Sequence, residues 1–249
     1  MEDLDIVYVV RPGDDNEELR YSLRSLANLP HRDVWLAGHR PPWVRNVGSV
    51  ETQPRPEKWA NINQSLLAAC QCEHISQRVI VFNDDIFVTR RIEEFPTFHL
   101  GPLAQHIERL DSRRKAASNS YHRGLLETRQ QLHEWGITDP LSYEAHVPMI
   151  WDRDELARLI ETSTRRPFLY ATAYPASSGP VGEQGINVKV AKHDRDTLDA
   201  KLAAGLPFIS SDDESFTHGA IGDYIRGMFP TPGPYEATPH PADKHPTHS

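Results

Sequence analysis

The 249-residue chain contains very little cysteine and has no excess of basic residues. Its two cysteines, Cys70 and Cys72, are too close in sequence for an ordinary structural disulfide, and no second pair completes a zinc site. We therefore interpret both as reduced residues, which indicates a cytoplasmic protein. The 27 Lys and Arg residues are outnumbered by 35 Asp and Glu, giving a formal net charge of −8. This balance argues against a general nucleic-acid coat and against a binder of anionic membranes, because both need basic patches.

Long hydrophobic runs are also missing. The first apolar stretch, residues 6–10, is too short for the hydrophobic region of a signal peptide. No segment approaches the ~18 apolar residues that a transmembrane helix requires. The sequence therefore predicts neither a secretory signal nor a membrane span. With 38% hydrophobic residues, a chain of this length suits one α/β domain with elaborations.

Short β-branched runs alternate with helical patterns over the first third of the chain. Strands are predicted at 5–10, 33–37, 45–51 and 78–82, and helices at 16–29 and 61–72. Strands that alternate with helices at this spacing form βαβ units. The pattern predicts a mainly parallel, Rossmann-like sheet that is covered by helices on both faces.

The rest of the chain is less regular. Residues 100–165 are expected to form a mostly helical insertion, with its clearest segments at 116–133 and 152–162. Residues 168–198 mix short runs with Pro and Gly and support no firm assignment, whereas 221–228 predict a final helix. From about Thr231 the chain is rich in Pro, His and Thr without periodicity, which predicts disorder. We expect one domain over residues 1–236 and a disordered tail over 237–249.

Two adjacent acids follow the strand predicted at 78–82. Asn83, Asp84 and Asp85 end this apolar run, and apolar residues resume at Ile86. Neighbouring carboxylates between apolar flanks repel each other and lose hydration, and a divalent cation would remove that penalty. Mg²⁺ or Mn²⁺ prefers oxygen ligands, often shared with a substrate diphosphate. The pattern therefore indicates a metal site at the carboxyl end of a strand, where α/β sheets bind ligands. Taken alone, it is equally typical of an ordinary turn.

Four separated stretches occur in an order that is hard to obtain by chance. They are Asp5-Ile-Val-Tyr8 with its Gly13-Asp14 turn; Glu18-Leu-Arg-Tyr-Ser-Leu-Arg-Ser-Leu26 continuing to Phe82-Asn-Asp-Asp-Ile-Phe87; Ala145-His-Val-Pro148, preceded by Asn119-Ser120; and Phe208-Ile-Ser-Ser-Asp-Asp213 running on to Met228-Phe-Pro230. Together they resemble the Stealth family of sugar-1-phosphate transferases over nearly the whole chain up to about residue 236. Two departures stand out: Val9-Val10 replaces the family's Thr-Trp, and Asp212-Asp213-Glu214 replaces an Asn-Asp-Asn-like stretch.

The resemblance implies a fold and a reaction. The fold is a GT-A-like core with a helical insertion. The reaction is metal-dependent transfer of a sugar 1-phosphate from a nucleotide sugar, expected to be a UDP-sugar, to an acceptor hydroxyl. The acceptor stays open among a glycan, a protein and a modified nucleic acid, and the oligomeric state is also open. The expected cofactor is Mg²⁺ or Mn²⁺.

The resemblance also implies roles for individual residues. His146 is expected to take the proton of the acceptor hydroxyl, because its unperturbed pKa lies near neutrality. Arg20 and Arg24 share one helix face and carry forked donors that suit phosphate, although their spacing alone is more typical of a solvated charged face. The expected site residues are Asp84, Asp85 and Asp213 for the metal; His146, Asp85 and Arg20 for catalysis; and Arg20, Arg24, Asn83, Asn119 and Lys58 for donor binding. Further candidates are Asn61, Arg165, Arg166 and His218.

Two other functions remain compatible with the sequence. A conventional GT-A glycosyltransferase would share the sheet, the metal turn and the nucleotide, but would move the sugar itself. A non-catalytic module that binds glycans or metals would lack turnover altogether. The released nucleotide distinguishes sugar-phosphate transfer from sugar transfer. Sugar-phosphate transfer releases a nucleoside monophosphate, and sugar transfer releases a nucleoside diphosphate.

Overall fold

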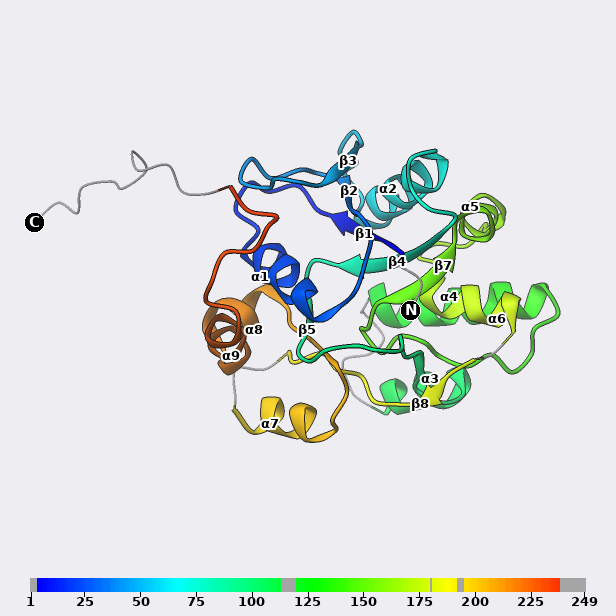
Figure 1. The fold of residues 1–249 in the computed structure, drawn as a ribbon. Coiled ribbons are helices and arrows are strands. Elements are labelled where there is room, and N and C mark those ends of the chain that lie inside the picture. The colour runs from blue at the N-terminus through cyan, green and yellow to red at the C-terminus, as the bar shows by residue number, and fades with distance from the viewer. Residues whose placement is uncertain (1–3, 113–119, 180, 192–194, 238–249) are drawn as a thin grey trace, which may run out of the picture.

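A computed structural model describes residues 4–112, 120–179, 181–191 and 195–237 (Figure 1). At its centre lies a five-stranded sheet with the order β3-β2-β1-β4-β7. The strands are β1 (Asp5–Val10), β2 (Val34–Gly38), β3 (Gly48–Glu51), β4 (Arg78–Asn83) and β7 (Met149–Asp152). The first four run parallel, whereas β7 pairs antiparallel with β4. The predicted mainly parallel sheet is therefore confirmed.

Helices cover both faces of this sheet. The helices of the described residues are α1 (Glu17–Ser25), α2 (Lys58–Gln71), α3 (Leu103–Asp111), α4 (Ser120–Glu134), α5 (Arg153–Thr162), α6 (Tyr170–Ser178), α7 (Arg195–Ala203), α8 (Asp213–His218) and α9 (Ala220–Met228), with a 3₁₀ turn (Leu26–Asn28) after α1. Two further strand pairs lie outside the sheet: β5 (Ile86–Val88) with β9 (Phe208–Ser210), and β6 (Phe98–His99) with β8 (Glu183–Gln184). Figure 1 shows α2 and α5 together on one side of the sheet and α1 on the other. Within the described residues, no helix has the length and apolar character needed to cross a membrane.

The side chains of β1 divide between two cores. Ile6 and Tyr8 pack with Leu19 and Leu23 of α1, whereas Val7 packs with Ala69 of α2. Successive side chains of a strand point to opposite faces, so a strand that is covered on both sides must be apolar throughout. This burial explains the unbroken β-branched run that predicted the strand.

The first residue of β1 is a fully buried carboxylate. Asp5 accepts hydrogen bonds from Arg32 Nε (2.8 Å) and Nη2 (2.6 Å), and from the backbone amides of Asp33 (3.2 Å) and Ser76 (2.7 Å). A buried charge is stable only when it is paired and hydrogen-bonded. Asp5 thus joins β1 to the loops before β2 and β4 at the start of the strand, and its role in the first family-like stretch is structural.

The region expected to be a helical insertion also contains strand β7. Its four residues follow Pro148, and its last residue, Asp152, accepts hydrogen bonds from the backbone amides of Asp154 (3.0 Å) and Glu155 (3.1 Å) as the N-cap of α5. Asp152 therefore marks the start of α5 in the sequence, and this signal gives no indication of the short strand that ends at the same residue. Of the helix predicted at 116–133, residues 116–119 lie outside the described residues.

The segment that follows α9 is ordered as far as residue 237, contrary to the disorder predicted from Thr231. Residues 233–237, here called the C-terminal strap, lie along α1 and the loop before β3 (Figure 1). The amide of Ala237 donates to Trp43 O (2.8 Å), and the amide of Arg45 donates to Tyr235 O (2.9 Å). The composition of the strap did not reveal these backbone pairings, because they involve a loop nearly 200 residues earlier. The expected tail, apart from Ala237, lies outside the described residues.

Candidate functional site

Polar residues from four parts of the chain meet at one edge of the sheet. Strand β4 ends beside β1, with Val9 opposite Asn83, and β7 begins beside β4, with Val81 opposite Met149. Because β7 runs in the opposite direction, the chain that enters it lies at the same edge as the carboxyl end of β4. Strand β9 also leads there, since the amide of Ser211 donates to Asp85 O (3.0 Å).

Four acids lie together at this edge, and we call Glu18, Asp84, Asp85 and Asp213 the acidic edge. Asp84 Oδ2 accepts a hydrogen bond from Asn16 Nδ2 (2.6 Å) and lies 3.7 Å from Arg11 Nε. Burial raises the pKa of Asp84, and the charge of Asp85 adds to that rise. Ionisation of Asp84 is therefore costly at this position.

Asp85 has one paired and one unpaired oxygen. Its Oδ2 accepts a hydrogen bond from Lys189 Nζ (3.0 Å). Its Oδ1 is buried and has no hydrogen-bond partner within the described part of the chain. A buried, unpartnered carboxylate oxygen is costly unless a ligand or an ion completes its environment. This atom is the clearest sign that the acidic edge suits a ligand or an ion.

Glu18 and Asp213 share Arg11. Arg11 binds both carboxylate oxygens of Asp213 and lies 3.5 Å from Glu18 Oε2, and Ser211 Oγ donates to Glu18 Oε1 (2.5 Å). The bond to Arg11 lowers the pKa of Asp213 to about 2. Burial raises the pKa of Glu18, because the buried carboxylate loses hydration. The opposite shifts of the two acids favour a pair with one negative charge instead of two.

The acidic edge fits a divalent cation in part. All its donors are oxygens, which Mg²⁺ and Mn²⁺ prefer, and Asp85 Oδ1 lacks a partner. Among residues 4–112, 120–179, 181–191 and 195–237, however, no three His, Cys, Asp or Glu side chains form a ready-made metal site. Asp213, the third expected ligand, is held by Arg11. The arrangement suits a cation bound by one or two carboxylates, with water or phosphate as the other ligands.

His146 lies in the loop that enters β7, in a conformation unusual for its residue type. Its φ is +57°, in the left-handed region, where a non-glycine residue is uncommon and is often functional. Its Nδ1 lies 3.1 Å from Asn187 Nδ2. Burial lowers the pKa of His146 to about 4, with help from the charge of Lys189 and a smaller effect of Lys58. The imidazole is therefore neutral at physiological pH.

Glu144 lies two residues before His146. Thr172 Oγ1 donates a hydrogen bond to Glu144 Oε1 (2.9 Å), and burial raises the pKa of Glu144 from 4.5 to about 7. Between these two values the folded protein holds a proton that the unfolded chain has released. Stability therefore falls as the pH rises through this window.

We expect Glu144→Gln to flatten this pH dependence. Between pH 5 and pH 7.5, the unfolding free energy of the wild type should fall relative to the variant by on the order of 2 kcal/mol. Urea unfolding of both proteins at the two pH values measures the difference. If the difference in unfolding free energy between wild type and variant were the same at both pH values, Glu144 would titrate normally.

Arg20 and Arg24 do not reach the acidic edge. Their side chains bind Glu236 of the C-terminal strap, with Arg20 Nη1 at 2.9 Å and Arg24 Nε at 2.6 Å from its carboxylate. The Arg20 guanidinium also lies over the Trp43 ring, 4.1 Å from its centroid. On α1, these arginines lie on a different side from Glu18, which faces Ser211. Their predicted contact with phosphate stays a prediction.

The other expected donor-binding residues divide among three places. Asn83 is exposed at the last position of β4, so it lies at the same edge as Asp84. Lys58 is exposed at the first position of α2, close enough for its charge to affect His146. Asn119 lies outside the described residues.

Three of the four further candidates have local partners in the described part of the chain. Asn61 holds the backbone of Arg55, Arg165 binds Glu127 and Glu134, Arg166 binds Ser163, and His218 ends α8. These contacts are structural, and in the described part of the chain they do not extend to the acidic edge.

Sequence reasoning missed two cations of the site, Arg11 and Lys189. Arg11 directly follows β1, so the carboxyl-end rule that singled out Asp84 could have found it. Lys189 had no comparable signal, because it follows no predicted strand and lies 104 residues from Asp85.

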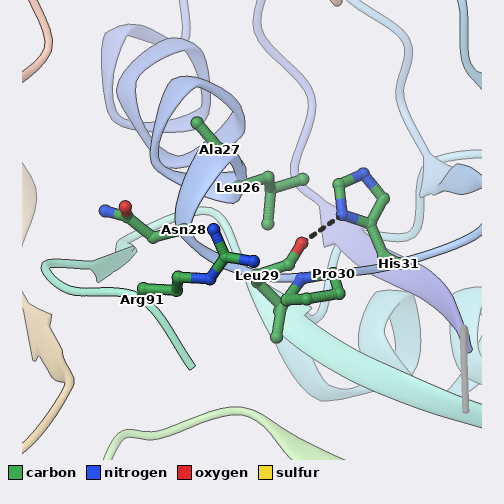
Figure 2. Close-up of a pocket in the computed structure, with 7 residues that line it drawn as sticks. All are labelled: Leu26, Ala27, Asn28, Leu29, Pro30, His31 and Arg91. Carbon is green, nitrogen blue, oxygen red and sulfur yellow. Dashed lines mark hydrogen bonds between the residues drawn. The ribbon is translucent and has the colours of Figure 1, made fainter. Parts of the chain in front are cut away.

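A surface hollow of about 320 Å³ lies away from these residues, at the end of α1. It is lined by Leu26, Ala27, Asn28, Leu29, Pro30, His31 and Arg91. Figure 2 shows the one hydrogen bond drawn among them, from His31 Nδ1 to Leu29 O (2.6 Å). None of the acidic-edge residues lines the hollow, so we do not assign the predicted chemistry to it.

Comparisons with known proteins give short or distant similarities. No family model matches the chain. The human N-acetylglucosamine-1-phosphotransferase subunits alpha/beta are 32% identical over 98 residues, which is 39% of this chain and only 6% of that protein. Two solved structures, an active-site mutant of LgtC and galactosyltransferase LgtC in complex with donor and acceptor sugar analogs, are 11% and 10% identical. Each alignment spans 93% of this chain and 98% of the LgtC chain, with a TM-score of 0.47. Membership of the Stealth family therefore stays a prediction.

Proposed function

We propose that this protein is a metal-dependent transferase that moves a sugar 1-phosphate from a nucleotide sugar, a UDP-sugar, to an acceptor hydroxyl. The observation that supports it most is the unpartnered Oδ1 of Asp85, buried beside Asp84 at the carboxyl end of β4. The short similarity to a human N-acetylglucosamine-1-phosphotransferase is consistent with this chemistry.

In this proposal Asp84 and Asp85 hold Mg²⁺ or Mn²⁺, and Asp213 is the third candidate ligand. The cation would neutralise charge on the diphosphate and on the leaving nucleotide. Asp213 can join only if it releases Arg11, which would then be available for phosphate oxygens. Arg11 and Lys189 carry the donors that suit such oxygens, as a planar fork and as a compact charge.

The proposed reaction exchanges one P–O bond for another. The acceptor oxygen attacks the phosphorus nearest the sugar, the bond to the nucleotide breaks, and a nucleoside monophosphate leaves. The proton of the hydroxyl passes to a basic group at the same edge. The main task of the protein is to align these atoms and balance their charge. The acceptor is a glycan, a protein or a modified nucleic acid.

A thermal-shift screen of nucleotide sugars, with and without Mn²⁺, tests this function. We expect a UDP-sugar to raise Tm by about 5–10 °C only when Mn²⁺ is present, because a ligand at about 100 times its Kd stabilises by about 2.7 kcal/mol. A sugar without its nucleotide is the matched control. If no nucleotide sugar shifts Tm with Mn²⁺ present, a non-catalytic binding module becomes the better explanation.

Product analysis then identifies the group that is transferred. Sugar-phosphate transfer predicts release of a nucleoside monophosphate. Release of a diphosphate would instead identify a conventional GT-A glycosyltransferase, which would use the same donor and cation.

A further inference from the structure

The side-chain amide of Asn187 has an orientation that two backbone groups fix. The amide of Lys189 donates to Asn187 Oδ1 (2.8 Å), and Asn187 Nδ2 donates to the carbonyl oxygen of Glu144 (3.2 Å). A backbone N–H can only donate and a backbone C=O can only accept. Exchanging the nitrogen and oxygen of Asn187 would therefore break both bonds. The assignment of these two atoms does not depend on any third partner.

This orientation determines which nitrogen of His146 carries the proton. Asn187 Nδ2 lies 3.1 Å from His146 Nδ1 and can offer only hydrogen atoms to it. His146 Nδ1 must therefore accept, and a neutral imidazole then holds its single proton on Nε2. Protonating Nδ1 as well would set two N–H groups against each other.

The backbone around this pair is held on both sides. The amide of Val188 donates to Ala145 O (3.0 Å), and Lys201 Nζ donates to the carbonyl oxygen of Asn187. The first bond joins residue 188 to the loop in which His146 has its left-handed conformation, and the second joins Asn187 to α7. The backbone on both sides of the contact between Asn187 and His146 is therefore held in place by hydrogen bonds.

The other ring nitrogen of His146 is free to meet a ligand. Within the described residues, Nε2 makes no hydrogen bond, and His146 is only partly buried. Val188 is bonded to Ala145, and the next residue, Lys189, binds Asp85 Oδ2 (3.0 Å), so the loop of His146 lies beside the acidic edge.

We propose that Asn187 is a positioning residue that fixes His146 as its Nε2–H tautomer, so that His146 donates a hydrogen bond to a phosphate oxygen of the substrate instead of accepting the proton of the acceptor. The choice of phosphate rests on the proposed function, whereas the tautomer rests on the hydrogen bonds alone. The proton of the acceptor hydroxyl then passes to water or to a base other than His146. This role replaces the general base that the sequence led us to expect at His146.

Nitrogen NMR of the full chain tests the tautomer without any substrate. In protein labelled with ¹⁵N-histidine at pH 7, the His146 signals are identified by their loss in His146→Gln. We expect a protonated Nε2 and an unprotonated Nδ1. Asn187→Asp, whose carboxylate can only accept, should move the proton to Nδ1, and Asn187→Leu should leave a mixture. A protonated Nδ1 in the wild type would overturn the proposal, as would an unchanged tautomer in a folded Asn187→Asp variant.

Substitution of His146 tests its role in transfer. Glutamine keeps an N–H donor near the position of Nε2, so His146→Gln should retain transfer to within about tenfold of the wild type. His146→Ala loses the donor and should fall about 100-fold or more. If His146→Gln is as slow as His146→Ala while His146→Glu is active, His146 is a base and the proposal is wrong. If wild-type protein transfers nothing, the proposed function fails, but the NMR result still decides the tautomer.

Discussion

Asp85→Asn is expected to lower the rate of transfer by about 1,000-fold or more while leaving the protein folded. Asparagine keeps the size of the side chain and one oxygen for Lys189, but removes the charge that binds a cation. Loss of one group that stabilises developing charge in a site costs about 10²–10³ in rate, and weaker cation binding adds to this. Initial rates at saturating Mn²⁺ and donor measure the effect.

The control for this variant is an acid of the same type outside the site. Asp223 is 89% exposed on α9, so Asp223→Asn should keep transfer within about twofold and Tm within about 2 °C. Asp84→Asn should also remove transfer while leaving the protein folded, because asparagine keeps an oxygen that can accept from Asn16 but removes the charge that binds a cation. A folded Asp85→Asn protein with more than a tenth of wild-type transfer would end the assignment of Asp85.

Glu236→Ala is expected to lower the unfolding free energy by about 3–5 kcal/mol. The Glu236 side chain is only 2% exposed and binds Arg20, Arg24 and the amide of Gly233. Removing one partner of a buried ion pair leaves the other charges uncompensated, which costs about this much. Urea denaturation followed by circular dichroism provides the measurement.

Two variants separate the buried charge from general effects of substitution. Glu236→Gln keeps the acceptor oxygen and should lose about half as much stability as Glu236→Ala. Glu161→Ala removes an exposed glutamate of α5 and should stay within about 0.5 kcal/mol of the wild type. A loss below about 1 kcal/mol for Glu236→Ala would mean that the strap holds α1 only weakly.

Local patterns predicted most of the sheet and the place of the candidate site. Alternating apolar runs identified β1 and β4, and the rule that ligands bind at the carboxyl ends of strands identified Asp84 and Asp85. The structure brings Asp213 and His146 to the same edge. The roles of these four residues stay predictions, which the variants above test.

Patterns in the sequence could not predict contacts between distant parts of the chain. Spacing showed that Arg20 and Arg24 share a helix face, but not that Glu236 binds both of them 212 or more residues later. In the same way, no local pattern pairs Arg11 with Asp213 or orients Asn187 toward His146. Strand β7 was missed because four residues are too few for a period-two pattern to stand out.

The long separations within the acidic edge have a consequence for synthesis on the ribosome. Asp85 is made about a hundred residues before Lys189, and Arg11 about two hundred before Asp213. Contacts between residues so far apart in sequence form late in folding, because bringing them together restricts the long chain between them. Strands β1 to β4 can pair on the nascent chain while Asp85 still lacks its partner Lys189. The acidic edge is thus among the last parts of the molecule to be completed.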